Sequence, residues 1–150
     1  MQFTTLILAL AASLPTTFGA ALPANGPHTG LPSPDHLLAN DYTNAVTCGQ
    51  KNAAVNMAIM GFCNRSVGPG NPTLANNLTV GHHWATGGVT HDGWRVKILD
   101  KGCPSDSRWV AAPYCNAQLH YLCAELGDAR GAGVAYWGAG GCQKWRIEHV

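Results

Sequence analysis

A helical pattern of apolar residues marks the first ordered element that we expect in this chain. Val55, Ile59 and Phe62 recur at the spacing that places side chains on one face of an α-helix. Ahead of them, Thr47 to Gln50 matches a capping box, in which a Thr hydroxyl and a Gln side chain satisfy the free N–H groups of a helix start. These residues predict a helix over about 48–60.

In the second half of the chain, apolar and polar residues alternate with a period of two, the pattern of half-buried strands. Trp94–Ile98 shows this alternation with basic residues at the polar positions, and Trp145–Glu148 repeats it near the C-terminus. Between them, the glycine-rich segment 131–141 predicts a hairpin. Residues 114–126 suit a second helix, with a buried strand as the alternative.

Together these elements predict an α+β fold, with one or two helices packed on a small, mostly antiparallel sheet stapled by disulfides. We expect this disulfide-stabilised domain to cover residues 45–150. The four prolines of residues 22–44 favour a flexible arm. Such a segment buries too little apolar surface to offset the entropy lost on ordering it.

The chain begins with the features of a secretory signal peptide. An apolar run from Phe3 to Leu14 stops at Pro15 and is too short to span a bilayer. The small residues Gly19 to Ala21 then offer a cleavage site. We therefore predict a signal peptide over residues 1–21 and a secreted, extracellular protein. No second apolar run is long enough for an anchor, so we expect no membrane partner.

The cysteines support export, because disulfides form and persist in oxidising compartments. An even number of cysteines in an exported chain predicts three disulfides, and the sequence leaves fifteen pairings open. Zinc is the competing interpretation, but no Cys-x-x-Cys pair supplies closely spaced ligands. We therefore expect neither a metal nor a cofactor. The six cysteines are Cys48, Cys63, Cys103, Cys115, Cys123 and Cys142.

Two acceptor patterns for N-glycosylation also fit export. They are Asn64-Arg65-Ser66 and Asn77-Leu78-Thr79, in a stretch rich in Pro, Gly and Asn that should form an exposed loop. We predict glycosylation at Asn64 and Asn77.

Composition and charge exclude further classes of protein. The chain has 150 residues, which fits one domain, and only 11% of them are charged. Its formal net charge of +1 argues against a disordered charged chain. A pI of about 7.7 argues against a strongly basic nucleic-acid binder.

Histidines, carboxylates and arginines could together form the site of a secreted ribonuclease. One group would take the 2′-hydroxyl proton, a His would protonate the leaving oxygen, and an Arg would stabilise the phosphate. Residues 41–43 and 47–49 resemble the opening of small fungal guanyl-specific ribonucleases, although the length and the number of cysteines differ. The candidates are His91, His120, His149, Glu125, Glu148, Arg95 and Arg146.

The five tryptophans could instead serve the core or a sugar-binding surface. Trp94 and Trp145 share a strand face with aliphatic residues, which predicts core positions. Trp84, Trp109 and Trp137 are flanked by Thr, Arg and Gly, so we expect them to be exposed. Residues 143–145 resemble the Gln-x-Trp motif of β-trefoil lectins, which implies glycan binding.

A basic stripe is a further candidate for binding. If residues 94–99 and 143–149 pair as strands, four basic side chains line up on one open sheet face and attract phosphate or an acidic polymer. The alternative is an ordinary solvated face, on which nearby acidic residues dilute the potential. The four side chains are those of Arg95, Lys97, Lys144 and Arg146.

The layout of the chain resembles the small secreted cysteine-rich proteins of fungi. The similarity consists of a signal peptide, about 130 mature residues, six cysteines and sequons in a loop. It implies a stable extracellular effector that binds a host protein or a cell-wall polysaccharide and contributes to virulence. The alternatives are a secreted ribonuclease-like hydrolase and an extracellular glycan-binding protein.

Overall fold

A computed structural model describes residues 31–65, 78–81, 83–85 and 87–150, with the side chains of residues 83 and 84 excepted. The predicted signal peptide and the first part of the predicted arm lie outside these residues. The predicted α+β class is confirmed, because helices pack on an antiparallel sheet that is accompanied by a smaller second sheet. No helix of the described part has both the length and the apolar character needed to cross a membrane.

The main sheet has four antiparallel strands in the order β3-β4-β7-β6. They are β3 (Val89–His91), β4 (Trp94–Asp100), β7 (Gln143–His149) and β6 (Gly133–Trp137). Both strands predicted from alternation are present and pair with each other in the centre of the sheet. The hairpin predicted over 131–141 is confirmed only in part, because this segment holds one strand, β6, and the turn, while the second strand of the hairpin is β7.

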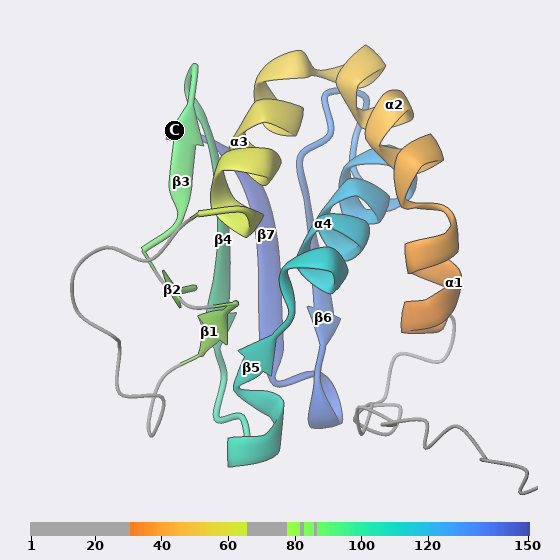
Figure 1. Cartoon of the computed structure of the whole chain (residues 1–150). Coiled ribbons are helices and arrows are strands. Elements are labelled where there is room, and N and C mark those ends of the chain that lie inside the picture. The colour runs from red at the N-terminus through yellow and green to blue at the C-terminus, as the bar shows by residue number, and fades with distance from the viewer. Residues whose placement is uncertain (1–30, 66–77, 82, 86) are drawn as a thin grey trace, which may run out of the picture.

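In the described part of the chain, four α-helices lie on one side of this sheet, where one or two were expected (Figure 1). They are α1 (Pro34–Ala39), α2 (Asp41–Lys51), α3 (Ala53–Cys63) and α4 (Ala112–Tyr121). A π-helical turn, Leu122–Leu126, extends α4. Residues 114–126 are therefore helical, as the preferred of the two sequence interpretations predicts.

The helix predicted over 48–60 is wrong in its start, because two helices meet inside this range. The break is at Asn52, whose side-chain oxygen accepts hydrogen bonds from the N–H groups of Ala54 and Val55 at 3.1 and 3.2 Å. Thr47, the expected cap, lies inside α2. Both residue types cap helices well, and here the Asn supplies the cap.

The flexible arm predicted over residues 22–44 is wrong from Pro34 onwards. Ser33 caps α1, since its hydroxyl accepts a hydrogen bond from the His36 N–H at 3.3 Å. Pro34 occupies the first turn, where the missing N–H costs nothing and the fixed φ suits a helix. Leu37 is fully buried and holds α1 to the domain. Pro34 therefore marks the start of a helix rather than part of an arm.

A smaller sheet joins β1 (Thr79–Val80) to β2 (His83–Trp84) and, in parallel, to β5 (Trp109–Val110). Backbone hydrogen bonds fix the parallel pair, from Thr79 N–H to the Arg108 carbonyl at 2.8 Å and from Gly81 N–H to the Val110 carbonyl at 2.7 Å.

All six cysteines form disulfides, as predicted. Cys48–Cys123 joins α2 to the π-helical turn, and Cys63–Cys115 joins the end of α3 to α4. Cys103–Cys142 ties the segment after β4 to the start of β7. Each bond typically contributes about 2–4 kcal/mol to a small domain, so they carry a large share of its stability.

The hydrophobic core lies between the main sheet and the helices. Trp145 is completely buried, and Trp94 is buried nearby, which confirms both as core residues. Strands β4 and β7 alternate buried and partly exposed positions along their length. Other large, fully buried side chains of the sheet and of α3 and α4 include Val96, Ile98, Ile147, Val55, Ile59, Phe62 and Leu119.

Candidate functional site

The face of the main sheet turned away from the helices gathers basic side chains. Alternation places Arg95 and Lys97 of β4 on this face, and Lys144 and Arg146 of β7 beside them. Lys97 is directly opposite Arg146 in the register. The predicted basic stripe is therefore assembled by the pairing of β4 with β7. We call these four residues, together with Glu148, the basic face.

Glu148 lies at the centre of three of these cations. Its Oε1 accepts hydrogen bonds from Arg95 through Nε at 2.9 Å and Nη2 at 2.6 Å, and it contacts Lys97 Nζ at 2.7 Å. Its Oε2 lies 2.6 Å from Arg146 Nη2. The Glu148 side chain is only 13% exposed. One carboxylate thus serves as the shared counter-ion of three basic side chains.

The register explains why this carboxylate is held so firmly. Like charges directly opposite each other in a sheet repel, and Lys97 opposite Arg146 is such a pair. Glu148 faces Arg95 across the ladder and follows Arg146 by two residues, so all three cations reach it. The hydrogen bond from Lys97, reinforced by that from Arg95 and opposed by burial, lowers the pKa of Glu148 from 4.5 to about 2.

A carboxyl group with this pKa is a poor proton acceptor near neutral pH. General bases work best when their pKa lies near the working pH. Glu148 is instead a permanently ionised group that orients its neighbours. The arrangement is thus suited to binding anions rather than to transferring protons.

The basic face also concentrates the charge of the whole chain. It holds four of the nine Lys and Arg residues but one of the eight Asp and Glu residues, which gives it three net positive charges. The five remaining basic and seven remaining acidic residues give the rest of the molecule two net negative charges. A field of one sign over one face attracts ligands of the opposite sign.

Two side chains of β6 that offer apolar surface lie beside these cations. Val134 is directly opposite Arg146, and Tyr136 is directly opposite Lys144. The Lys144 ammonium lies 5.9 Å from the centre of the Tyr136 ring, within the range of a cation–π contact. Val134 is exposed. The surface thus offers a column of cations next to a column of apolar groups.

The structure does not bring the predicted catalytic residues His91, His149 and Glu125 together with Glu148. His91 and His149 flank Trp94 in the register, so they share the face opposite to that of Glu148. The His149 ring packs edge-on against Trp94, with ring centres 5.1 Å apart. Glu125 is exposed on the π-helical turn. In the described part of the chain, no hydrogen bond or ion pair joins it to either histidine.

His120, the third histidine of the predicted set, is buried between helices. Its Nδ1 lies 2.6 Å from Asp41 Oδ1, so the pair links α4 to the start of α2. Such a buried contact holds helices together. We therefore assign it a structural part.

The three tryptophans expected on the surface do not form a common plane. Trp109 is 55% exposed, as predicted, and its indole N–H donates to the Gly81 carbonyl at 2.9 Å. Trp137 was expected to be exposed, and this is wrong. It lies on the inward face of β6, is only 9% exposed and packs against Trp145 at 5.1 Å. The Trp84 side chain lies outside the described residues.

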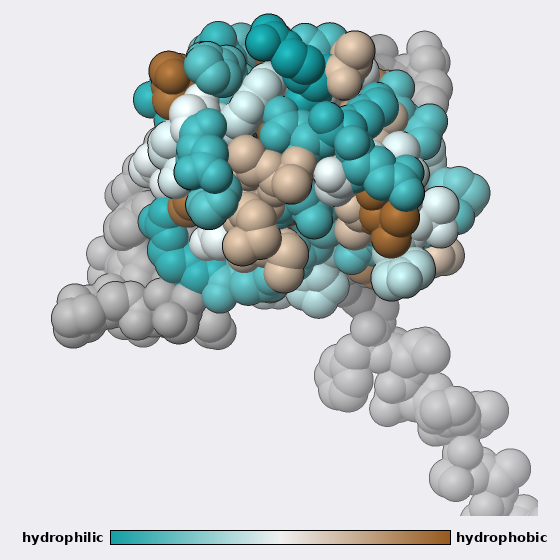
Figure 2. All heavy atoms as spheres, turned by 90° about the horizontal axis from the view of Figure 1, so that it is seen from above, coloured by the Kyte–Doolittle hydropathy of each residue, from teal (hydrophilic) through white to brown (hydrophobic). Residues whose placement is uncertain are grey.

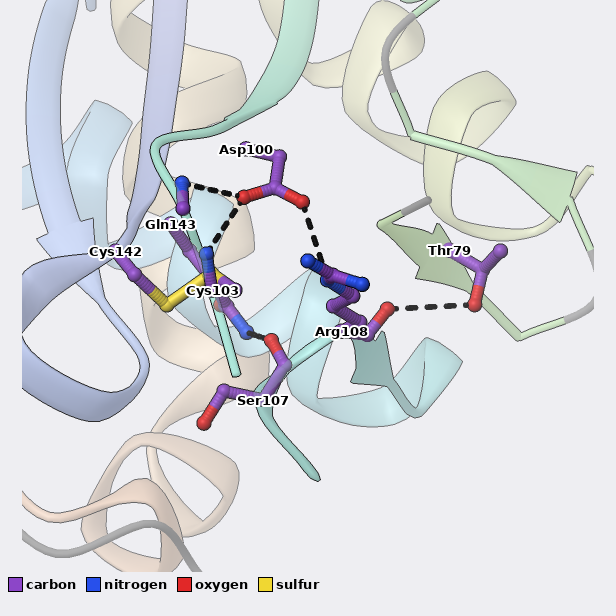
Figure 3. Close-up of polar contacts among 8 residues, drawn as sticks. Thr79, Asp100, Cys103, Ser107, Arg108, Cys142 and Gln143 are labelled. Atoms are coloured by element: carbon purple, nitrogen blue, oxygen red, sulfur yellow. Dashed lines mark hydrogen bonds and ion pairs between the residues drawn. A yellow bond between two sulfur atoms is a disulfide. The ribbon is translucent and has the colours of Figure 1, made fainter. Parts of the chain in front are cut away.

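The Gln-x-Trp sequence has a local structural explanation at the end of the sheet shown in Figure 3. The buried Gln143 donates from Nε2 to the Ser107 carbonyl at 2.7 Å. Its Oε1 accepts a hydrogen bond from the indole N–H of Trp145 at 3.1 Å. These contacts satisfy the polar atoms of two buried side chains, and they support the core rather than a lectin surface.

Asp100 holds the turn that follows β4 at the same end of the sheet. Its Oδ1 accepts hydrogen bonds from the N–H groups of Gly102 and Cys103 at 2.8 and 2.7 Å, which fixes the turn that leads into the Cys103–Cys142 disulfide (Figure 3). Its Oδ2 lies 3.5 Å from Arg108 Nε. Asp100 is on the inward side of β4, so it leaves the charge of the basic face unchanged.

Of the predicted glycosylation sites, Asn64 is exposed at the end of α3. Its side-chain oxygen accepts a hydrogen bond from Asn116 at 3.1 Å. Asn77 lies outside the described residues. Glycosylation at both positions stays a prediction.

Exposed apolar side chains on the helices are a second candidate for a binding surface. Tyr42 and Val46 are exposed on α2, and Met57 and Met60 are exposed on α3. Seen from above, the end of the molecule near α2 and α3 is mainly hydrophilic, with apolar groups in small separate areas (Figure 2). Scattered apolar side chains of this kind are normal on a protein surface. The basic face is therefore the stronger candidate.

Comparisons of the chain with protein-family models, curated proteins and solved structures give no match. Sequence reasoning found the four cations but treated Glu148 as a diluting charge or a catalytic group. The strand alternation pointed to its face, but only the register shows that three cations converge on it.

Proposed function

We propose that this chain is a secreted, effector-like protein that binds a host or cell-wall target through its basic face. The observation that supports the proposal is the gathering of four cations on a sheet face that no described helix covers. A surface of this kind steers anionic partners towards the protein and fixes their orientation.

The rest of the molecule is suited to such a role outside the cell. Three disulfides support the proposed secretion, because bonds of this kind persist in oxidising surroundings. Two of them join the helices to one another, and Cys103–Cys142 ties together the ends of β4 and β7, the two strands that carry the basic face. A rigid surface loses little entropy on binding, which favours recognition of a fixed target.

Binding to isolated cell walls and to extracellular host proteins tests this proposal. We expect the mature protein to be retained and to be released by salt, since exposed ionic contacts are screened. Lys144→Glu should abolish most of the retention. Arg130→Glu is the matched control, because Arg130 is exposed beside Trp94, away from the basic face, and the change in charge is the same. Equal retention of the two variants, or no retention of the natural protein, contradicts the proposal.

The ribonuclease-like hydrolase has one supporting observation, a carboxylate held between two arginines. Arg95 and Arg146 both reach this carboxylate, and they supply the phosphate-stabilising part of the set that the sequence predicts for RNA cleavage. An RNA-cleavage assay separates this second candidate from a binding protein. Cleavage that Arg146→Gln abolishes would favour the hydrolase, and absence of cleavage would favour binding alone.

A further inference from the structure

We infer that the ligand of the basic face is an acidic polysaccharide whose sugar units carry carboxylates, that is, a polyuronate. This inference rests on the proposed function and names the chemistry of the target. It is carried by the way the face holds its own carboxylate and by the two columns of side chains on β6 and β7.

The basic face already shows the geometry of carboxylate binding. Nitrogen–oxygen distances of 2.6–2.9 Å connect Glu148 to three cations, and Arg95 contacts one oxygen through both Nε and Nη2. These are the distances of charge-assisted hydrogen bonds. Arg95 and Arg146 are each about 40% exposed, so their guanidinium groups have room for a second anion. Guanidinium forks are well matched to carboxylates.

The columns of β7 and β6 match the two sides of an acidic sugar chain. On β7, Lys144 and Arg146 are two residues apart, which is about 7 Å along a strand. Directly opposite them on β6 are Tyr136 and Val134. A uronic acid unit has a carboxylate at one edge and a face of C–H groups. The carboxylates can therefore contact the cations while the C–H faces lie on Tyr136 and Val134.

The same surface is less suited to other polyanions. Single-stranded nucleic acid is held by several aromatic rings on which successive bases stack. Among the described residues, Tyr136 is the one aromatic side chain on this face of the sheet. A membrane surface is usually bound by an amphipathic helix that inserts apolar side chains, and here the face consists of strands. RNA and anionic lipid are therefore outcomes of the test rather than the inferred ligand.

Polygalacturonate and its methyl ester provide the decisive pair of probes. Both have the same sugar backbone, but the ester lacks the free carboxylates. We expect the mature, disulfide-bonded protein to bind polygalacturonate measurably in a biosensor at low ionic strength and to bind the ester at least about tenfold more weakly. Parallel measurements use a single-stranded RNA and vesicles that contain phosphatidylserine.

Variants then locate the site. Lys144→Gln should weaken binding to polygalacturonate about fivefold, the loss expected for one charge-assisted hydrogen bond, while Arg130→Gln should change it less than about twofold. Tyr136→Ala should weaken binding as well, because the ring loses its contact with the sugar face. Circular dichroism and thermal unfolding of each variant separate a loss of contacts from a loss of fold.

Three results would overturn the inference. They are equal binding to the ester, equal effects of the Lys144 and Arg130 substitutions, and tighter binding to RNA or to vesicles than to polygalacturonate. The proposed function can survive each of them. Salt-sensitive retention on cell walls or host proteins that Lys144→Glu abolishes would still support the basic face, with a target of another chemistry.

Discussion

The two faces of the main sheet are built from the same strands but hold different kinds of side chain: apolar and buried on one face, charged and partly exposed on the other. On the inner face, Trp145 and its aliphatic neighbours are fully buried under the helices. On the outer face, Lys97 and Arg146 stand opposite each other and depend on Glu148 for compensation. The inner face gains its stability from excluded water, whereas the basic face keeps charges together at an energetic cost. A fold that retains such a surface has its stability and its binding potential on opposite sides of one sheet.

The largest effect should follow from breaking the inner face at its centre. Trp145→Ala removes the largest fully buried side chain, and such truncations cost about 3–5 kcal/mol in the free energy of unfolding. Trp109→Ala is the control, because that ring is more than half exposed and should cost about 1 kcal/mol or less. Denaturant unfolding measures both. Similar losses in the two variants would mean that Trp145 does not anchor the core.

The next largest effect concerns the Cys103–Cys142 disulfide, which joins the segment after β4 to the start of β7. Replacing Cys103 and Cys142 together by Ser should lower the free energy of unfolding by about 2–4 kcal/mol, because the unfolded chain gains freedom. The four strands should stay in place, since their pairing does not depend on this bond. Denaturant unfolding and far-ultraviolet circular dichroism test the two statements. Loss of the strand signal in the native variant would show that the bond is needed to form the sheet.

Glu148→Gln should have a smaller effect. We expect it to lower the free energy of unfolding by an amount on the order of 2 kcal/mol after allowance for solvent screening. Because the folded-state pKa of Glu148 is about 2 and its ordinary value is 4.5, the unfolded chain takes up the proton first as the pH falls. Its stabilising contribution is therefore complete above about pH 5 and is lost on the way down to about pH 2.

Unfolding measured between about pH 2 and pH 6 checks this dependence. The natural protein should lose stability across the interval, and the Gln variant should lose less of it. Parallel curves for the two proteins would indicate that Glu148 does not stabilise the folded state. Glu125→Gln is the matched control, because Glu125 is exposed on the π-helical turn and loses the same charge.

The smallest effect on stability is expected for Lys144, a residue whose substitution should clearly weaken binding. Lys144→Gln should change the free energy of unfolding by no more than about 0.5 kcal/mol, because its ammonium contacts an aromatic ring on the surface and a partly exposed cation contributes little. Thermal unfolding beside the polygalacturonate measurement gives both values. A large loss of stability would show that Lys144 supports the fold, and weaker binding by the variant would then not identify Lys144 as a ligand contact.

Local patterns in the sequence were sufficient for the centre of the fold. The alternation of Trp94–Ile98 and of Trp145–Glu148 identified both central strands, because each has a strongly apolar face and a charged face. Trp137 was misjudged because its glycine-rich surroundings resemble a surface turn, whereas strand β6 points it inward. The break at Asn52 was missed because α2 and α3 are both helical and only a side-chain cap separates them.

The candidate site was only half predictable, for a physical reason. Which side chains share a face follows from alternation within one strand. Which of them touch depends on the register between β4 and β7, and this pairing joins Arg95 to Glu148 across 53 residues of sequence. No local pattern fixes such a long-range register, so the shared counter-ion emerged only with the structure.

The sequence spans closed by the three disulfides overlap, so a single cut in the backbone inside these spans does not release a fragment. Cys48 pairs with Cys123, Cys63 with Cys115, and Cys103 with Cys142. At any peptide bond between residues 48 and 142, at least one S–S bridge still connects the portions before and after it. A protease that makes one cut there produces a nicked molecule that stays in one piece, because the two portions remain covalently joined.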